Sequence, residues 1–307
     1  MTLFALETDP LTFAYPGGPT LLNGMPFRAA AGQLTVLIGA NGAGKSTLMR
    51  ILAGLLRAGR AGVRLRGEVS GDPADGAGRR AEGVELSRLS ARERARWTAF
   101  LPQTVVPPED VRVEEVVALG RHPHERWWSL PGPADAERLR VALSAVGAAG
   151  LLGRMFAELS GGEQQAVLLA SVLVQATPVL LLDEPGKALD IHHQAVLFAR
   201  LRSMAAEGRT VVAITHDLNI AARYADRLAL LHGGHIVADG APREVLTAQR
   251  LQATYGPDVT VVPDPRDGLP IVLPAADLGR PMNRVVLEGA ARAGEPRGDA
   301  AEAAHGA

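Results

Sequence analysis

Short apolar runs and amphipathic stretches alternate along this chain, and the alternation predicts its fold class. The apolar runs lie at 33–38, 179–182 and 210–214. A short continuous apolar run is typical of a strand buried on both faces, as in a parallel sheet. The stretches between these runs carry helical patterns. We therefore expect an α/β protein whose mostly parallel sheet is covered by helices.

The remaining segments complete the expected order of elements. Helices are expected over 45–55, 90–97, 113–120, 133–148, 161–176 and 190–206, after His216, and twice more before 259. Strands are expected over 11–14 and 98–101, in a hairpin over 227–232 and 235–239, and in a small pair within 259–273. The glycine-rich segment 57–85 predicts part strand and part long exposed loop.

The pattern also predicts how the chain is divided. Since 102–160 carries mostly helix, a helical lobe is expected over about 102–176, within one domain covering 1–285. The last residues, 286–307, are rich in Ala, Gly, Glu and Arg, a composition that predicts a disordered tail.

Composition and charge exclude several classes of function. The chain has 32 Lys plus Arg against 33 Asp plus Glu, so no basic excess points to nucleic acid. It has no cysteine, which excludes disulfides, thiolate metal sites and thiol catalysis. We find no secretory signal and no apolar stretch of the roughly 20 residues that span a bilayer. Work at a membrane would therefore require a second chain that spans it.

A glycine-rich loop between the first apolar run and the next helix predicts a phosphate-binding site. Its residues are Gly39, Ala40, Asn41, Gly42, Ala43, Gly44, Lys45, Ser46 and Thr47. They fit the pattern G-x-x-x-x-G-K-[ST], in which backbone N–H groups and the helix N-terminus face phosphate oxygens. Lys45 is expected to reach the β- and γ-phosphates, and Ser46 to ligate Mg²⁺. A plain glycine turn would not require the upstream strand and the Lys-Ser pair together.

Two further motifs carry candidate chemistry. The second apolar run ends in Asp183 and Glu184, at the strand end where ligands of open parallel sheets bind. Asp183 is expected to hold Mg²⁺ and Glu184 to deprotonate an attacking water. A solvated acidic turn is the alternative. The segment 159–163 places Ser160 as an N-cap before Gly161 and Gly162, so it predicts at least a capped helix.

Together these motifs resemble the ATPase subunit of ABC transporters over about residues 5–250. In that resemblance 159–163 is the signature segment, 101–103 the Q-loop, 186–190 the D-loop and 215–217 the segment of the switch histidine. Tyr15 matches the aromatic residue that stacks on adenine. The resemblance implies a P-loop NTPase-type sheet core, an N-terminal antiparallel β subdomain, and a helical lobe that carries the signature.

The resemblance also implies an assembly. ATP and Mg²⁺ would sit between the glycine loop of one subunit and Ser160, Gly161 and Gly162 of a second copy in a head-to-tail homodimer. Gln103 would approach Mg²⁺ and the attacking water, and His216 the γ-phosphate. Partners would be integral membrane permease subunits and, indirectly, an extracytoplasmic substrate-binding protein. The chain would be peripheral, at the cytoplasmic face of the cell membrane, and would have no nucleic acid partner.

The substrate class follows from a narrower likeness. Residues 113–124 are similar to the corresponding segment in importers of ferric siderophores, haem and cobalamin, and 191–194, 216–226 and 255–274 agree with that group. The version at 114–121 favours haem, with a ferric siderophore next and cobalamin as the alternative. The histidines His122, His124, His192 and His193 are not expected to bind metal or haem, because the substrate passes through the membrane subunits.

Four departures from the family pattern leave other functions open. Gly186 and Lys187 replace the usual Thr and Ser, Ala166 stands where arginine is usual, and Ser171 where a second is common. None removes a phosphate or Mg²⁺ ligand, but they leave the hydrolysis rate and the dimer geometry open. The alternatives are a soluble ABC ATPase outside transport and a regulatory subunit with little turnover.

Overall fold

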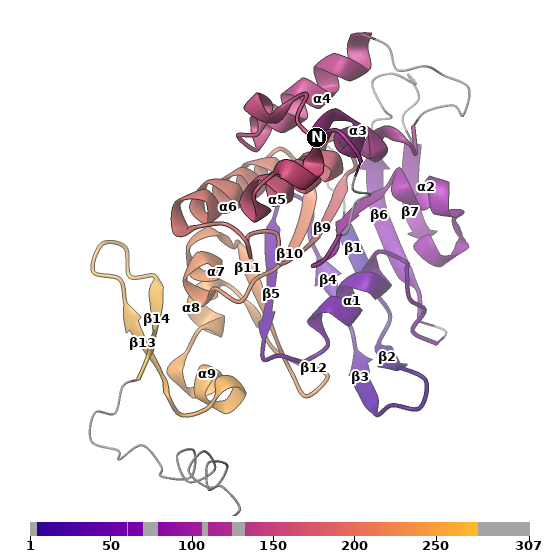
Figure 1. Ribbon diagram of the computed structural model, residues 1–307. Helices are drawn as coiled ribbons and strands as arrows, with labels where there is room; N and C mark the ends of the chain where they lie inside the picture. The colour runs from indigo at the N-terminus through magenta and orange to yellow at the C-terminus, as the bar shows by residue number, and fades with distance from the viewer. Residues whose placement is uncertain (1–4, 60, 70–78, 106–109, 125–132, 276–307) are drawn as a thin grey trace, which may run out of the picture.

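A computed structural model describes residues 5–59, 61–69, 79–105, 110–124 and 133–275 of this chain (Figure 1). The helices are α1 (Lys45–Leu52), α2 (Ala91–Ala95), α3 (Val113–Ala118), α4 (Pro133–Ala145), α5 (Gly161–Val174), α6 (Ile191–Ala206), α7 (Leu218–Tyr224), α8 (Pro242–Val245) and α9 (Ala248–Tyr255). The strands are β1 (Ala5–Thr8), β2 (Leu11–Ala14), β3 (Thr20–Met25), β4 (Arg28–Ala29), β5 (Leu34–Gly39), β6 (Val63–Val69), β7 (Arg79–Glu85), β8 (Thr98–Leu101), β9 (Val179–Asp183), β10 (Thr210–Ile214), β11 (Arg227–His232), β12 (His235–Gly240), β13 (Val259–Pro263) and β14 (Pro270–Pro274).

The three apolar runs form the middle of the main sheet. Its strand order is β12-β11-β5-β10-β9-β8, and every neighbouring pair is parallel except β11 with β12. All residues of β5, β9 and β10 are buried. The prediction of a mostly parallel, helix-covered sheet is therefore confirmed. Because these strands are parallel, their carboxyl ends all meet at one edge of the sheet.

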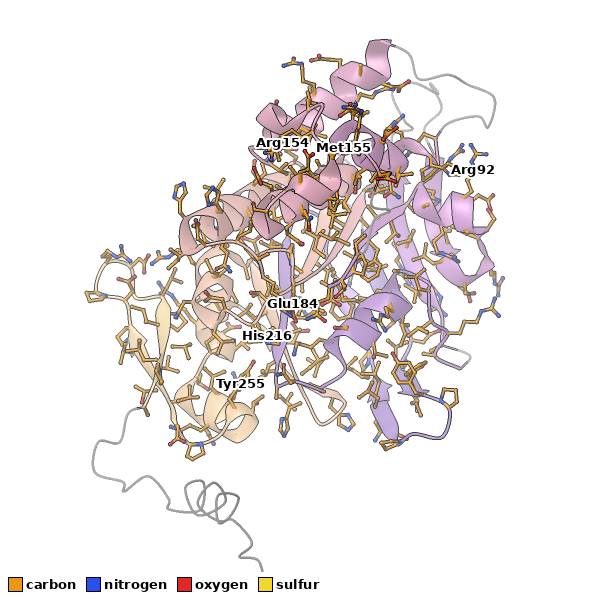
Figure 2. All side chains as sticks on the ribbon, viewed as in Figure 1. Arg92, Arg154, Met155, Glu184, His216 and Tyr255 are labelled. Carbon is orange, nitrogen blue, oxygen red and sulfur yellow. The ribbon has the colours of Figure 1, made fainter. Side chains whose placement is uncertain are left out.

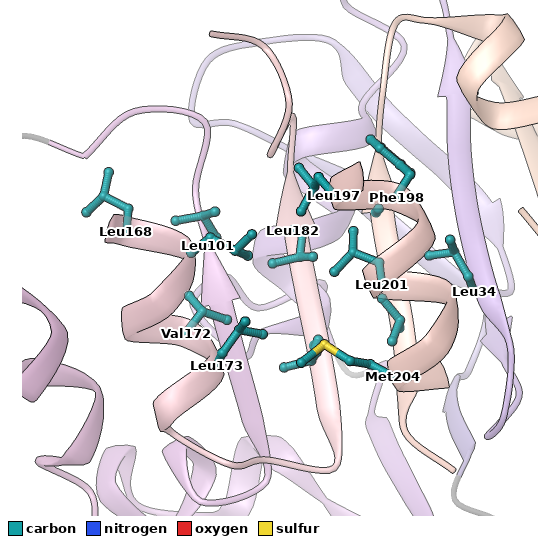
Figure 3. Close-up of a cluster of buried hydrophobic side chains, with 14 of the residues drawn as sticks. Leu34, Leu101, Leu168, Val172, Leu173, Leu182, Leu197, Phe198, Leu201 and Met204 are labelled. Carbon is teal, nitrogen blue, oxygen red and sulfur yellow. The ribbon is translucent and has the colours of Figure 1, made fainter. Parts of the chain in front are cut away.

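Side chains of the sheet alternate between two hydrophobic clusters. In β9, Leu180 and Leu182 belong to the cluster shared with α5 and α6, whereas Val179 and Leu181 belong to the cluster shared with α1 and the N-terminal strands. This alternation follows from the two-residue period of a strand. Figure 3 shows Leu182 between side chains of α5, such as Val172, and side chains of α6, such as Leu201. The sheet is therefore held from both faces.

The N-terminal strands form an antiparallel layer, as the family resemblance implied. One sheet has the order β4-β1-β6-β7, and β2 pairs with β3. The expected strand content of 57–85 is confirmed by β6 and β7, which pair antiparallel. Residues 70–78 lie outside the described residues. The expected tail, 286–307, lies outside them too.

Helices α3, α4 and α5 follow one another between β8 and β9 and lie together at the top of the view (Figure 1). Two expected helices end three residues earlier than predicted. The first ends at Leu52 and not at 55, because Gly54 adopts φ +70° and the N–H groups of Gly54 and Leu55 bond back to Ile51 and Arg50. Gly147, at φ +72°, ends α4 in the same way. No described helix is long and apolar enough to span a membrane.

Candidate functional site

The glycine-rich loop runs from the carboxyl end of β5 into α1, and two of its glycines are sterically required. A Cβ at Gly39, whose φ is +147°, would lie 2.2 Å from the carbonyl oxygen of Leu231. A Cβ at Gly44, at φ +97°, would lie 2.7 Å from the side chain of Leu22. Only glycine fits these positions without a shift of its neighbours. The loop therefore curls tightly ahead of the helix N-terminus, which is the geometry of a phosphate cradle.

Lys45 is buried at the start of α1 and lies across the loop. Its Nζ donates hydrogen bonds to the carbonyl oxygens of Gly39 at 2.7 Å and Ala40 at 3.0 Å. Burial lowers the pKa of the Lys45 ammonium, and the nearby carboxylates of Glu184 and Asp183 oppose that shift. The ammonium is thus held against the loop and beside both acidic residues that follow β9.

A cavity of about 870 Å³ opens over the loop. It brings together four of the predicted groups: the loop residues 41–47, Gln103, Glu184 and His216, with Thr215 beside them. The remaining lining residues are Leu21, Gly186, Lys187, Gln194 and Asp217. The volume suits a polyphosphate with part of a nucleoside.

Glu184 is the centre of a hydrogen-bond network at this cavity. Its Oε1 lies 2.6 Å from Nε2 of His216, and its Oε2 accepts a hydrogen bond of 2.9 Å from Nε2 of Gln103. Figure 2 shows Glu184 and His216 close together at the carboxyl ends of the central strands. Glu184 has φ +55°, a conformation that non-glycine residues adopt at some energetic cost, typically at functional sites. The sequence predicted all three residues for catalysis, and the structure brings them into contact.

The environment keeps Glu184 in its charged form. Burial alone would raise the pKa of Glu184, since only 8% of its side chain is exposed. Hydrogen bonds from His216, Gln103 and Lys187 together outweigh burial, so its pKa is lowered. The side chain is therefore unprotonated at neutral pH, which is the form that a general base requires.

Asp183, the last residue of β9, has the features of a cation ligand. It is almost fully buried, and burial raises its pKa while a hydrogen bond from the Ser46 hydroxyl lowers it. Within the described part of the chain, its Oδ1 has no hydrogen-bond partner. A buried carboxylate oxygen without a donor, next to a hydroxyl, fits a hard divalent cation such as Mg²⁺. Asp183 and Ser46 thus lie together as predicted.

The remaining predicted residues take two different positions. The Tyr15 hydroxyl lies 3.2 Å from Oγ1 of Thr47, so the ring stands beside the end of the loop with 41% of its surface exposed. Ser160, Gly161 and Gly162 do not line the loop cavity. Ser160 accepts a hydrogen bond from the backbone N–H of Glu163 as the N-cap of α5, and it borders a separate cavity of about 540 Å³.

Three residues of the site were given no role by the sequence. Gln194 donates a hydrogen bond of 2.9 Å to the carbonyl of Gly186 and so holds the turn after Glu184. Lys187 places its Nζ 3.3 Å from Oε2 of Glu184, whereas in the sequence it stood out only as a departure from the family pattern. Tyr255 forms a hydrogen bond with the backbone of Gly39, and burial raises its pKa to about 12. Only the Tyr255-Gly256-Pro257 motif gave a signal, and it indicated a subgroup, not a contact.

Comparison with known proteins agrees with this geometry. Residues 22–187 match the family model described as ABC transporter. The hemin import ATP-binding protein HmuV of Nocardia farcinica is 42% identical, covering 83% of this chain and 82% of that protein. The ferric enterobactin transport ATP-binding protein FepC of Escherichia coli is 37% identical, covering 90% and 94%.

A solved structure described as a metal-chelate type ABC transporter in an inward-facing conformation has a TM-score of 0.72. It is 24% identical to this chain and covers 90% of it and 99% of the solved chain. At that identity the likeness concerns the fold, and the fold is the same along nearly all of the described residues.

Proposed function

The chain belongs to the ABC transporter family, and from that premise we propose that it is the ATP-hydrolysing subunit of an importer for haem or another iron chelate. The observation that carries the proposal is the contact of Glu184 with both Gln103 and His216 at the mouth of the loop cavity. These three groups lie where a terminal phosphate held by the loop would meet water.

We assign the residues of the site separate roles in ATP hydrolysis. The backbone N–H groups of 41–47 and the Lys45 ammonium bind the phosphates, and Tyr15 stacks on the adenine ring. Glu184 orients the attacking water and accepts its proton, while His216 contacts the γ-phosphate. Ser46, Asp183 and Gln103 would hold Mg²⁺, which supplies charge neutralisation for the phosphates when it is bound. Asp183 suits this role because its Oδ1 is buried and lacks a donor among the described residues.

A second copy of the chain completes each site. Ser160, Gly161 and Gly162 begin a 14-residue helix, α5, whose N-terminus can bind an anion. In a single chain this end does not line the loop cavity, so we infer that it contacts ATP held by the partner in a head-to-tail homodimer. ATP would close this dimer, and hydrolysis with product release would reopen it.

The transport partners follow from the family and from the relatives. ABC importer ATPases work with membrane permease subunits, and we place this chain peripherally at the cytoplasmic face. An extracytoplasmic substrate-binding protein would deliver the substrate. Haem is favoured because the hemin import protein of Nocardia farcinica is 42% identical, and a ferric siderophore is next because FepC is 37% identical. Cobalamin is the alternative substrate.

Substituting the proposed base tests the enzymatic role. Glu184→Gln keeps the shape and the contact with His216 but cannot take a proton, so ATP binding should persist while turnover falls by at least about 100-fold. Glu207→Gln, at the exposed end of α6, is the matched control and should hydrolyse ATP as the parent does. Unchanged turnover in Glu184→Gln would contradict the assignment of the base. Vesicles containing the permease, tested with haem and with a ferric siderophore, distinguish the substrates.

A further inference from the structure

The sequence contains two lysines and thirty arginines, and both lysines line the cavity over the phosphate loop. Lys45 belongs to the loop motif. Lys187 has no part in the mechanism described above. A lysine ammonium is a compact charge on a flexible stem, so it can exchange one anion for another more readily than the planar arginine fork. The placement of the second lysine in a chain that otherwise uses arginine calls for a physical account.

The backbone of Lys187 is held by hydrogen bonds, while its side chain is mostly exposed. The Lys187 N–H donates to the carbonyl of Glu184 at 3.2 Å, and Gln194 holds the carbonyl of Gly186. A Cβ at Gly186 would lie 3.2 Å from Gln194, so glycine lets this turn pack closely on α6. By contrast, 65% of the Lys187 side chain is exposed. The turn therefore places an exposed ammonium at a fixed point of the cavity wall.

The present partner of Lys187 is an anion that the reaction needs. Its Nζ lies 3.3 Å from Oε2 of Glu184, the same oxygen that accepts from Gln103. A water that delivers its proton to Oε2 has to displace one of these donors. Lys45 is buried and bonded to the carbonyls of Gly39 and Ala40, so it binds phosphate from the loop and does not compete for Oε2 of Glu184. A terminal phosphate bound next to Glu184 would carry more negative charge than the single carboxylate.

We propose that Lys187 is a second phosphate-binding lysine, which pairs with Glu184 when the site is empty and moves to the terminal phosphate when ATP binds. The move frees Oε2 of Glu184 for the attacking water. ADP lacks the terminal phosphate, so Lys187 stays on Glu184 when ADP is bound. The inference rests on the proposed ATPase function and adds to it a group that distinguishes the triphosphate from the diphosphate.

The test compares the affinity for ADP with that for adenylyl imidodiphosphate, an ATP analogue that is not hydrolysed. In Lys187→Met the analogue should bind about fivefold more weakly, as expected for loss of one exposed charge-assisted contact, with ADP affinity changed less than about twofold. Lys187→Arg keeps the charge and should retain most of the discrimination. Light scattering, run alongside, restricts the comparison to monomers, so that dimer closure does not contribute.

The outcomes separate this inference from the proposed function. Equal changes for both nucleotides in Lys187→Met, or none, overturn the phosphate contact, even if turnover falls. Lys45→Ala should lose both nucleotides, and its failure to do so would count against the proposed function instead.

Amine acylation of the parent chain gives a second measurement. Mass spectrometry should find Lys187 protected by the analogue and not by ADP. Equal labelling of Lys187 in the two nucleotide states would contradict the proposal.

Discussion

Gly39→Ala should be far more destabilising than Gly42→Ala, although both positions lie in the same loop and both have positive φ. At Gly42, with φ +78°, an added Cβ meets nothing within 4 Å. Only the backbone conformation then opposes alanine, at about 1 kcal/mol. At Gly39, with φ +147°, the added Cβ would lie 2.2 Å from the carbonyl oxygen of Leu231 and 3.1 Å from its carbon.

The overlap at Gly39 cannot be relieved by a side chain, because the obstructing atoms are backbone. Gly39 and Leu231 are paired between β5 and β11 in the middle of the buried sheet. Relief requires these strands to separate by about 1 Å, which adds an overpacking cost of about 1–3 kcal/mol to a backbone strain of about 1–3 kcal/mol. The free energy of unfolding should therefore fall by about 4 kcal/mol in Gly39→Ala and by about 1 kcal/mol in Gly42→Ala.

Urea unfolding followed by circular dichroism measures both values, with the slope m compared between variants to check that the unfolding transition is the same. If Gly39→Ala lost no more stability than Gly42→Ala, the close approach of β11 to the loop would be refuted.

Two further predictions concern the core and the C-terminal hairpin. Leu182→Ala removes a fully buried side chain between α5 and α6 and should lower the free energy of unfolding by about 3 kcal/mol. The control, Leu152→Ala, lies at an exposed position and should change the free energy of unfolding by less than about 1 kcal/mol. Similar losses in the two variants would contradict the packing shown in Figure 3. Asp264 is paired with Arg266 and Arg223, which hold the pKa of its carboxyl group far below the usual 3.8. The stabilisation that this pairing gives the folded state is therefore complete above pH 3.8 and is lost as the pH falls below that value. The difference in free energy of unfolding between the parent and Asp264→Asn should thus be constant from pH 5 to 7 and shrink below pH 4; a difference that did not depend on pH would refute the pairing.

The parts that the sequence predicted are those determined by short stretches of chain. The loop 39–47 carries its glycines, lysine and helix start within one segment, and β9 carries Asp183 and Glu184 directly at its end. Strand type followed from continuous apolar runs, because only strands inside a parallel sheet are buried along their whole length. Chemistry encoded locally could therefore be assigned before the fold was known.

The features that the sequence did not predict depend on contacts between residues that are distant in the sequence, or on the conformation of a turn. The contact of Lys187 with Glu184 follows from a turn that Gln194 holds, and periodicity carries no information on that turn. Tyr255, the last residue of α9, bonds Gly39 at the end of β5, far away in the sequence. Likewise, the side chain of Asn219 bonds the backbone of Val272 at 2.8 Å and 3.2 Å and so docks β14 on α7.

The way the chain enters and leaves the helical lobe determines how tilting of the lobe would be transmitted. The chain leaves the carboxyl end of the edge strand β8, two residues before Gln103, and returns to the amino end of its neighbour β9. At the returning end, the Gln175 side-chain amide donates hydrogen bonds to the carbonyls of Ala95 and Thr98, and the backbone carbonyl oxygen of Gln175 lies 2.9 Å from Nε2 of His124. The lobe is thus tied to the sheet at its returning attachment, and at its leaving attachment Gln103 is tied to Glu184. If a permease tilted the lobe, the lobe would turn about Gln175. The displacement at the sheet would then reach Gln103 and, through its hydrogen bond, the carboxylate of Glu184.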